Sequence, residues 1–412
     1  MTTFISSIII FSLVIIIHEL GHFWAAKSVG IKVHEFSIGM GPEIKSIQGE
    51  ETKYSIKLFP IGGYVKMEGE DDDSFSEDSF NSKSVLSRLK VIFMGPLMNF
   101  ILALIIFVIV IGVYGISGNT IAEVESSLNE YKTGLRPGDK IVKINDEKVK
   151  YWEEIQEEIS SSSENYQITV ERNKELHEYE VDHNYRYMIG ISPEIIEDEY
   201  TNTVGFIDET MPAYEGGLRS GDKIISINKV KTNNWNETRE LINNSSGNKI
   251  ELEIERDKEI LKLEILPIKQ VTIGFYTETQ KSISDILLGS VYKTTYYINL
   301  MFNFIIMLVS GKVGSEAIAG PVGIVNMIGQ AASLGFYPLL NLAAFISINL
   351  GFVNLLPIPA LDGSRILFLL IEKIRGKRIP PDKEGYIHFV GFVLLMALMF
   401  FVLYNDIIRI LR

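Results

Sequence analysis

The pentapeptide His18-Glu19-Leu20-Gly21-His22 has the residue types and the spacing of a catalytic metal site. On a helix, positions i and i+4 share a face, so both imidazoles can reach one metal ion. Glu19 would then lie beside the open coordination position, where it can take a proton from metal-bound water and pass it to a leaving amine. The alternative is a chance match on an ordinary helix.

The surroundings of this motif favour the metal site. It directly follows Ile8 to Ile17, a run that is almost entirely aliphatic. An uncompensated charge at the centre of a bilayer costs roughly 2.5–3.5 kcal/mol on insertion scales, so such residues persist there mainly for function or by pairing. A structural polar cluster would not need the observed spacing. We therefore interpret the motif as a metal site inside a membrane helix.

A third ligand is needed, because catalytic zinc sites usually have three protein ligands. A later apolar run ends in Asn354-Leu355-Leu356-Pro357-Ile358-Pro359-Ala360-Leu361-Asp362-Gly363. Two prolines break the helix there, which predicts Asp362 in an irregular turn on the side where His22 emerges. A plain loop or helix-cap aspartate is the alternative. Asn354, still within the span, would either donate a hydrogen bond to the developing oxyanion or bond a neighbouring helix.

The composition agrees with a membrane protein that also has soluble segments. Hydrophobic residues make up 46% of the 412 residues and gather in a few long runs, and the net charge of −13 argues against nucleic acid as a partner. The chain contains no cysteine, which excludes disulfide scaffolds, cysteine zinc fingers and thiol catalysis. Zinc would therefore use histidine and carboxylate ligands, although two histidines and a carboxylate also hold other divalent ions.

Four apolar runs are long enough to cross the ~30 Å hydrocarbon layer, which takes about 20 residues. They extend approximately over the segments Phe4 to Ala26, Val91 to Ile116, Pro338 to Leu356 and His388 to Tyr404. A shorter stretch, Ile298 to Val309, predicts an interfacial or re-entrant helix. A cleaved signal peptide is the alternative for the first run, but that run lacks a basic start and its cleavage would remove the motif.

The distribution of lysine and arginine predicts the orientation. Basic residues follow the first run and the third run, so the positive-inside rule places both loops in the cytoplasm and residues 117–290 outside. With a rise of 1.5 Å per residue, His18 lies roughly 20 Å from the outer end of its helix. The site is therefore expected within the membrane, nearer its cytoplasmic face.

An internal repeat lies between the second and third runs. The segment GLRPGDKIVKIN at residues 134–145 recurs as GLRSGDKIISIN at residues 217–228, an offset of 83 residues. Each copy predicts a glycine-bounded turn, an alternating strand and an Asn-led turn. The pair resembles two tandem PDZ modules, which bind extended peptides at a sheet edge. It either captures peptide tails or acts as a steric gate, and we favour exclusion of intact substrates.

The loop after the first run alternates apolar and polar residues with glycines over residues 31–66, which predicts a β-hairpin-rich segment beside the metal motif. A soluble linker hairpin is the alternative. The acidic stretch from Glu68 to Asp78 is typical of a solvated loop. The histidines His34, His177, His183 and His388 show no partner pattern and are interpreted as ordinary residues. His388, at the membrane edge of the fourth run, is the one that merits inspection.

Three motifs together resemble the site-2 protease family of intramembrane zinc metalloproteases. They are H-E-x-x-H in the first run, Met94-Gly95-Pro96-Leu97-Met98-Asn99-Phe100 opening the second, and Asn354 with Leu361-Asp362-Gly363 ending the third. Their order and the spacer domains resemble the bacterial regulator-of-sigma-E-protease type over nearly the whole chain. The resemblance implies Zn²⁺ bound by His18, His22 and Asp362, with Glu19 catalytic and Asn354 assisting the transition state.

The resemblance also implies a multi-pass protein of the bacterial inner membrane that cleaves single-span membrane proteins. Anti-sigma factors and remnant signal peptides are the expected kinds of substrate, often after a first cut by another protease, so an upstream site-1 protease is an expected partner. Residues 31–66 would form a membrane-associated β-loop that pairs with unfolded substrate. A membrane scaffold with a vestigial metal site and a secreted zincin with a cleaved leader are the competing hypotheses. The substrate and the oligomeric state stay open.

The predicted fold is a membrane protein with four transmembrane helices, a membrane-associated β-rich loop and two tandem extracytoplasmic PDZ-like domains. The predicted segments are, in chain order, the first transmembrane helix with H-E-x-x-H (1–30), a cytoplasmic β-loop region with an acidic linker (31–90), the second transmembrane helix (91–116), two PDZ-like domains (117–198 and 199–270), an interfacial or re-entrant segment (271–337), the third transmembrane helix with the L-D-G motif (338–363), a basic cytoplasmic loop (364–387) and the fourth transmembrane helix (388–412).

Overall fold

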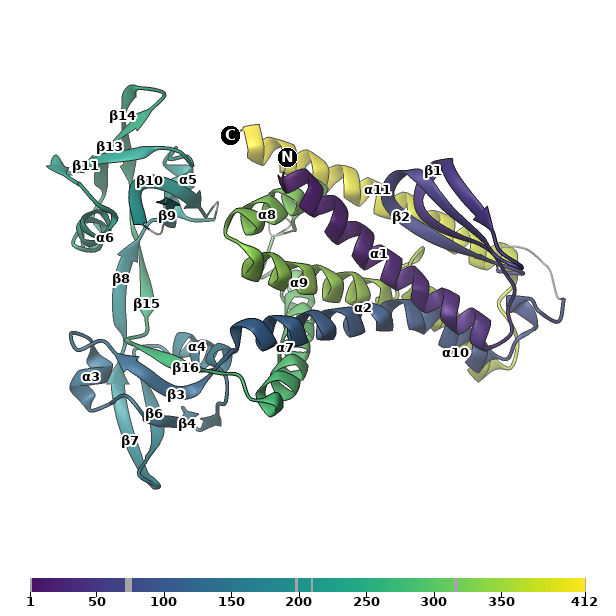
Figure 1. The fold of residues 1–412 in the computed structure, drawn as a ribbon, viewed down its shortest axis with the longest axis horizontal. Coiled ribbons are helices and arrows are strands. Elements are labelled where there is room, and N and C mark those ends of the chain that lie inside the picture. Colours follow the sequence, from purple (N-terminus) through teal and green to yellow (C-terminus); the bar gives the residue numbers. More distant parts are fainter. Residues whose placement is uncertain (1, 71–75, 197–198, 209, 315–317, 412) are drawn as a thin grey trace. The chain divides into compact units, whose positions relative to one another are not determined.

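The computed structural model describes residues 2–70, 76–196, 199–208, 210–314 and 318–411 (Figure 1). The chain forms two compact units. One combines Met1–Ile116 with Lys281–Arg412, and the other is Ser117–Gln280. The first unit holds the long apolar helices, and the second holds most of the strands.

Four helices of the described residues are long and apolar enough to cross a membrane. They are α1 (Thr2–Ser28), α2 (Val85–Tyr114), α9 (Phe336–Leu355) and α11 (Pro381–Leu411). Their number agrees with the prediction. The helix α2 begins at Val85, before the predicted Val91, because Ser84 caps it by accepting a hydrogen bond from the backbone N–H of Ser87.

The helix α2 is the centre of the helical unit. It packs against α1, α9, α7 (Ile283–Val309) and α10 (Asp362–Arg375), and α1, α2 and α9 run side by side in Figure 1. Small residues allow this close packing: a Cβ on Gly21 of α1 would overlap the backbone of Met94, and a Cβ on Gly351 of α9 would lie 2.9 Å from the carbonyl oxygen of Pro96. Such small-residue crossings are a usual basis of helix association in membranes.

Two segments have more helix than the sequence predicted. The stretch Ile298 to Val309 is the end of the continuous 27-residue helix α7, which Ser282 caps. The prediction of a basic loop over residues 364–387 is wrong, because α10 occupies residues up to Arg375. The apolar face of α10, with Leu369 in a buried cluster, holds it against the rest of the unit. A final helix, α8 (Pro321–Ser333), packs against α1.

The loop after α1 forms the predicted β-rich segment. It consists of β1 (Val33–Gln48) and β2 (Lys53–Met67). Residues 33–38 pair with residues 63–67, residues 35–38 also pair with residues 53–56, and residues 43–48 pair with residues 53–57. Positive φ angles at Gly39, Gly41 and Gly62 mark the bends that fold the two strands into this layered pairing. Residues 71–75 of the predicted acidic loop lie outside the described residues.

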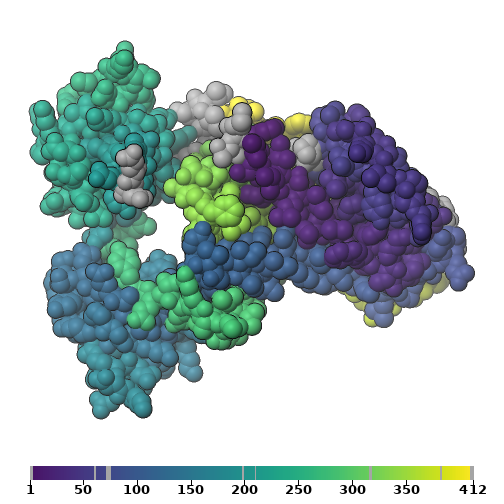
Figure 2. Space-filling model, viewed as in Figure 1, coloured from purple at the N-terminus to yellow at the C-terminus, as the bar shows by residue number. Residues whose placement is uncertain are grey.

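Apolar side chains cover the outside of the helical unit. Figure 2 shows α1, in purple, uncovered along one face, and its exposed residues include Phe4, Ile9, Leu13 and Trp24. The helix α11 is the most exposed of the four, since only 11% of its most apolar window is buried. Exposed apolar helix faces of this size are typical of contact with lipid.

The second unit contains two similar sheets. The first has the strand order β16-β3-β4-β6-β7, with β5 beside β4, and the second has the order β14-β13-β11-β10-β9, with β12 beside β11. The strands of the first are β3 (Ile116–Val124), β4 (Lys140–Ile144), β5 (Glu147–Lys148), β6 (Asn165–Arg172), β7 (Glu175–Asp182) and β16 (Phe275–Gln280). Those of the second are β9 (Ile191–Ile196), β10 (Glu199–Ile207), β11 (Lys223–Ile227), β12 (Val230–Lys231), β13 (Ile250–Arg256) and β14 (Glu259–Ile265). Short helices complete the two halves, α3 (Asn129–Thr133) and α4 (Trp152–Ser161) in the first and α5 (Pro212–Glu215) and α6 (Trp235–Asn243) in the second.

The repeated sequence forms repeated contacts. Asp139 in the first copy and Asp222 in the second are each 1% exposed, and each carboxylate binds an arginine of a following strand. The Nε atoms of Arg172 and Arg256 donate to these carboxylates over 2.6 Å and 2.7 Å respectively. The hydrogen bond to Asp139 raises the pKa of the Arg172 guanidinium above its ordinary value. The same buried ion pair thus fixes the turn in both halves.

The chain path between the two sheets corrects one predicted boundary. An antiparallel ribbon of β8 (Asn184–Met188) and β15 (Ile268–Thr272) leads to the second sheet and back, and β16 then joins the first sheet beside β3. The second half is therefore inserted into the first. The β-structure ends at Gln280, so the predicted boundary at residue 270 is too early.

Candidate metal centre and active site

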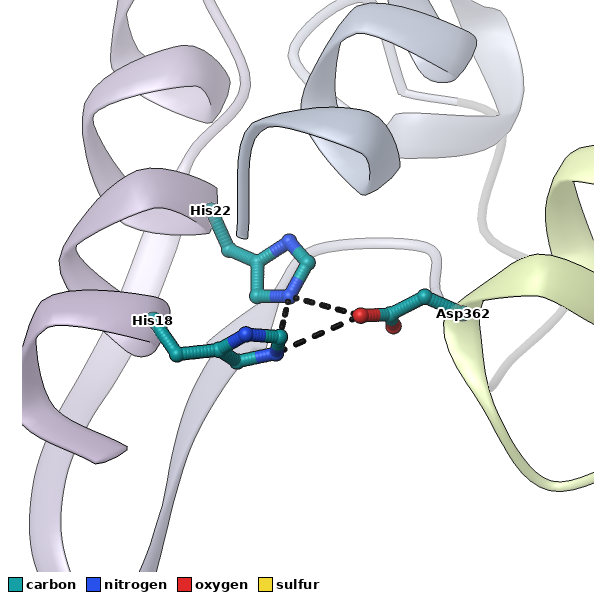
Figure 3. A group of neighbouring side chains, drawn as sticks. All are labelled: His18, His22 and Asp362. Atoms are coloured by element: carbon teal, nitrogen blue, oxygen red, sulfur yellow. Dashed lines mark hydrogen bonds and ion pairs between the residues drawn. The ribbon is translucent and has the colours of Figure 1, made fainter. Parts of the chain in front are cut away.

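Three predicted ligands from opposite ends of the chain meet at one point (Figure 3). The Nε2 atoms of His18 and His22, both on α1, are 3.2 Å apart. Oδ2 of Asp362, the first residue of α10, lies 3.3 Å from Nε2 of His18 and 3.4 Å from Nε2 of His22. The prediction placed Asp362 in an irregular turn, whereas the structure places it at a helix start.

These distances match the geometry that zinc requires. Zinc binds histidine nitrogen and carboxylate oxygen at about 2.0–2.1 Å in a tetrahedral arrangement, in which neighbouring ligand atoms are about 3.3 Å apart. The triangle formed by the ligand atoms of His18, His22 and Asp362 has edges of 3.2, 3.3 and 3.4 Å. A zinc ion held by these three atoms would keep a fourth position for water or substrate, as catalytic zinc sites do.

The hydrogen bonds behind the imidazoles also favour a metal ion. Nδ1 of His22 lies 3.0 Å from the carbonyl oxygen of Val91, to which it can only donate, so Nε2 of His22 carries a lone pair. Nδ1 of His18 lies 3.3 Å from the amide nitrogen of Asn99, whose oxygen is buried and accepts no hydrogen bond from the described residues. The two amide atoms are nearly equal in size, so turning the Asn99 amide over lets its oxygen accept the Nδ1 proton of His18. Both imidazoles then present lone pairs to the same point.

The carboxylate completes this convergence of acceptors. Oδ2 of Asp362 is buried and receives no properly directed hydrogen bond from the described residues. The side chains of His18 and His22 are only 9% and 11% exposed. Three buried acceptor atoms within 3.4 Å of one another repel unless a cation lies between them. The residues present therefore fit a zinc ion.

The helix α2 shapes the wall behind His22. A Cβ on Gly95 would overlap the imidazole of His22, with Nε2 and Cε1 both under 3.0 Å away. Glycine at this position leaves the room that the metal-facing nitrogen occupies. The roles of Gly95, Asn99 and the Val91 carbonyl were not predicted from the sequence. A polar Asn99 inside an apolar run was the available signal, because such residues in membrane helices usually have a functional partner.

Two ion pairs hold α10 in place. The Arg88 guanidinium on α2 is 5% exposed and binds the Glu372 carboxylate with contacts of 2.5 Å and 3.1 Å. Arg365, one turn after Asp362, pairs with Glu70, which follows β2. Both contacts join α10 to other elements of the helical unit. They therefore restrict the position of the helix that presents Asp362.

Of the two predicted catalytic side chains, Glu19 lies close to the three ligands, whereas Asn354 has no hydrogen bond to them among the described residues. Glu19 is half-buried, and its carboxylate interacts electrostatically with both imidazoles and with Asp362. The sheet approaches it closely, since a Cβ on Gly63 of β2 would lie 3.1 Å from Cγ of Glu19. Asn354 is half-buried near the end of α9. Among the described residues no hydrogen bond joins it to the three ligands, so its catalytic role stays a prediction.

Comparisons with known proteins identify the family of this chain. A model of peptidase family M50, the site-2 protease family, matches residues 6–398. The chain belongs to peptidase family M50. The predictions of a zinc metalloendopeptidase of the site-2 protease family, and of zinc as its cofactor, are thereby confirmed.

Similar curated proteins extend over nearly the full length of this M50 peptidase. The regulator of sigma-W protease RasP of Bacillus subtilis is 32% identical, with 99% of this chain and 98% of that protein covered. The zinc metalloprotease RasP of Geobacillus kaustophilus is 31% identical over 98% and 97%. The regulator of sigma E protease of Haemophilus influenzae is 30% identical over 98% of both chains.

Several solved structures resemble a small part of the chain. A PDZ domain of HtrA3 bound to a phage-derived ligand is 21% identical over 22% of this chain and 91% of its own, with a TM-score of 0.19. A serine endoprotease from Yersinia pestis is 23% identical over 21% and 30%, also with a TM-score of 0.19. The number and the placement of PDZ-like domains therefore stay proposals.

Proposed function

We propose that this M50 peptidase hydrolyses peptide bonds of single-span membrane proteins inside the lipid bilayer. The observation that carries the proposal is the convergence of His18, His22 and Asp362 on one point, with Glu19 beside it. The two histidines and Glu19 lie on a helix that is long and apolar enough to cross a membrane. Water and a general base are therefore brought to a depth where ordinary proteases do not act.

The chain's own residues can divide the reaction between them. When bound, zinc supplies a Lewis acid that polarises the scissile carbonyl and makes water more acidic. Glu19 takes a proton from the attacking water and delivers it to the amine nitrogen of the leaving segment. Asn354 donates a hydrogen bond to the oxyanion once substrate has bound. The Val91 carbonyl keeps the imidazole of His22 in the tautomer that a metal needs, and the Asn99 amide does the same for His18 when its oxygen faces Nδ1.

The β-sheet gives a reason for placing substrate beside Glu19. A helix must unwind before its peptide bonds can be cut, and an unwound segment needs partners for its backbone. Residues 63–67 pair with residues 33–38 on one side, and Gly63 packs against Glu19. We assign the sheet the role of a membrane-associated loop that pairs with unwound substrate.

The positive-inside rule supports the proposed orientation. It places the active site near the cytoplasmic face of a bacterial inner membrane and the unit Ser117–Gln280 outside the cytoplasm. Relatives named for the regulation of sigma-W and sigma E support substrates of the anti-sigma factor type. Remnant signal peptides are a second expected substrate class, because they too are short apolar helices in the membrane. An upstream site-1 protease that first trims such substrates fits this order of events.

The two repeated halves of Ser117–Gln280 are proposed to be PDZ-like domains that gate access. Their shared strand order and their matching pairs, Asp139 with Arg172 and Asp222 with Arg256, support a tandem repeat. Two folded domains next to the helical unit in the chain would exclude substrates that still carry a bulky external domain. We favour this gating over the capture of a free peptide tail.

Two competing hypotheses explain less of the structure. A scaffold with a vestigial metal site does not need Glu19, nor the groups on α2 that orient the imidazoles of His18 and His22. A secreted zincin with a cleaved leader would lose both histidines, because they lie on α1. The complete constellation therefore supports a working peptidase.

The direct test of the proposal uses purified full-length protein in liposomes with a single-span substrate. We expect cleavage at a peptide bond within the apolar span of the substrate, located by mass spectrometry of both products. The reaction should stop when zinc is removed with a chelator and resume when zinc is restored. Cleavage only at exposed flanking residues would contradict hydrolysis inside the membrane.

The gating proposal is tested by changing the substrate rather than the enzyme. A folded domain fused to the external end of a cleaved substrate should reduce its cleavage strongly, and protease removal of that domain should restore it. Replacing the last external residues, without added bulk, should have little effect. Normal cleavage of the bulky substrate combined with loss on changing the end residues would favour tail capture instead.

A further inference from the structure

The turn that leads to Asp362 contains a residue in an unfavourable backbone conformation. Ala360 has a φ of 78°, in the left-handed region that residues with a Cβ rarely adopt. It lies two positions before Asp362, inside a tight turn in which the N–H of Leu361 donates to the carbonyl of Ile358 over 3.1 Å. Some contact must stabilise this conformation, because an unsupported alanine relaxes to a negative φ.

That contact comes from α11. Nδ1 of His388 accepts a hydrogen bond of 3.0 Å from the backbone N–H of Ala360. Three residues later on α11, Gly391 packs against the preceding residue of the turn, and a Cβ there would lie 2.6 Å from the carbonyl oxygen of Pro359. The imidazole of His388 also stands edge-on against Phe368 of α10, with ring centroids 5.6 Å apart. One histidine thus touches both the turn and the helix that Asp362 begins.

Most residues of α11 around this point, apart from Gly391, are exposed. A cavity of about 380 Å³ lies at the turn, lined by Asp362 and Arg365 on the α10 side and by His388, Phe389 and Phe392 of α11. The most apolar window of α11 is only 11% buried. The hydrogen bond from Ala360 to His388 is therefore a local attachment rather than part of a continuous helix interface.

We propose that His388 is a positioning residue for the zinc ligand Asp362, an inference that rests on the proposed metal site. By accepting the N–H of Ala360, His388 selects the left-handed turn that aims the Asp362 carboxylate at the two imidazoles. It needs no contact with substrate or metal. The hydrogen bond fixes its tautomer, with the proton on Nε2, 3.9 Å from the Glu384 carboxylate.

The proposal predicts the zinc affinity of four variants. His388→Leu removes the acceptor and should weaken zinc binding by about 10- to 100-fold, the usual effect of removing a group that orients a ligand. His388→Asn places an amide oxygen near the position of Nδ1 and should stay close to the natural protein. Ala360→Gly alone should also bind zinc normally, because glycine adopts a positive φ without strain. In the double variant Ala360→Gly/His388→Leu, zinc affinity should recover to within about threefold.

The measurements are zinc affinity, by competition with a chelator of known strength, and the visible absorption spectrum of the Co²⁺-loaded protein. The spectrum reports ligand geometry, which a general loss of packing would not alter selectively. Size-exclusion chromatography in detergent checks that each variant folds. Should His388→Leu fail to fold, His388→Gln, which moves the acceptor outward by one methylene, carries the same expectation of weakened binding.

Natural zinc affinity and an unchanged Co²⁺ spectrum in a folded His388→Leu protein would overturn the proposal. So would a double variant that binds zinc no better than His388→Leu, because rescue by glycine is specific to the backbone of Ala360. These results differ from a failure of the metal site itself. In that case the natural protein would bind no stoichiometric zinc at all.

Discussion

Glu19→Gln is expected to keep its zinc and lose its proteolytic activity. Glutamine has nearly the shape of glutamate, and Glu19 is not among the three converging ligands. Its amide cannot take up a proton from the attacking water. General acid–base groups contribute about 10²- to 10⁴-fold to rates, so the cleavage rate of a membrane-embedded substrate should fall by at least about 100-fold. Elemental analysis of the purified protein gives the zinc content, and gel analysis of substrate in liposomes gives the rate.

A matched control for this variant is Glu50→Gln, an exposed glutamate after β1. It makes the same chemical change outside the site and should leave both quantities unchanged. Full activity of Glu19→Gln would refute the proposed mechanism. Loss of zinc from Glu19→Gln would instead assign Glu19 to the assembly of the site and not to proton transfer.

Gly95→Ala is expected to disable the metal site from the neighbouring helix. The added methyl group would overlap Nε2 of His22. The imidazole must then turn away from the metal position and release its hydrogen bond to the carbonyl of Val91. Zinc affinity should fall by at least about tenfold, and activity should fall with it. Alanine favours helix more than glycine does, so α2 itself should not be weakened.

The same helix offers a control for this substitution. Gly112 has nothing within 4 Å of the position where a Cβ would be. Gly112→Ala makes the identical change in α2 and should retain zinc and activity. Equal behaviour of the two variants would show that the space at Gly95 is not needed by His22.

The convergence of the three predicted ligands could be expected from the sequence, because each position rests on local or topological information. The spacing of His18 and His22 fixes their shared helix face, and the two prolines after Asn354 indicate where the third apolar run ends. Counting spans then brings Asp362 to the same side as His22. In the structure Nε2 of His18, Nε2 of His22 and Oδ2 of Asp362 lie within 3.4 Å of one another.

The groups that support the ligands were not predictable in the same way. Gly95, Asn99 and His388 act across helix contacts, and those contacts depend on how the helices rotate and cross. The sequence of residues 364–387 is rich in basic residues and was interpreted as a loop. The structure makes α10 there, because its apolar residues share one face and Glu372 pairs with the buried Arg88.

The unit Ser117–Gln280 shows the same contrast between features that local sequence predicts and features that depend on distant contacts. The repeated turn and strand were visible at residues 134–145 and 217–228, since the signal is local. The return of β16 to the first sheet was missed. Pairing with β3 joins residues that are more than 150 positions apart in the sequence, and the strand itself carries no mark of its partner.

The central claim is that position 362 contacts the same metal ion as the histidines of α1, and Asp362→Cys tests it most directly. The chain contains no cysteine, so the variant has a single sulfur of this type. X-ray absorption spectroscopy distinguishes zinc–sulfur bonds of about 2.3 Å from zinc–nitrogen and zinc–oxygen bonds of about 2.0–2.1 Å. We predict one sulfur neighbour of zinc in Asp362→Cys and none in the natural protein. Zinc bound at full occupancy in the variant, without a sulfur neighbour, would contradict the account.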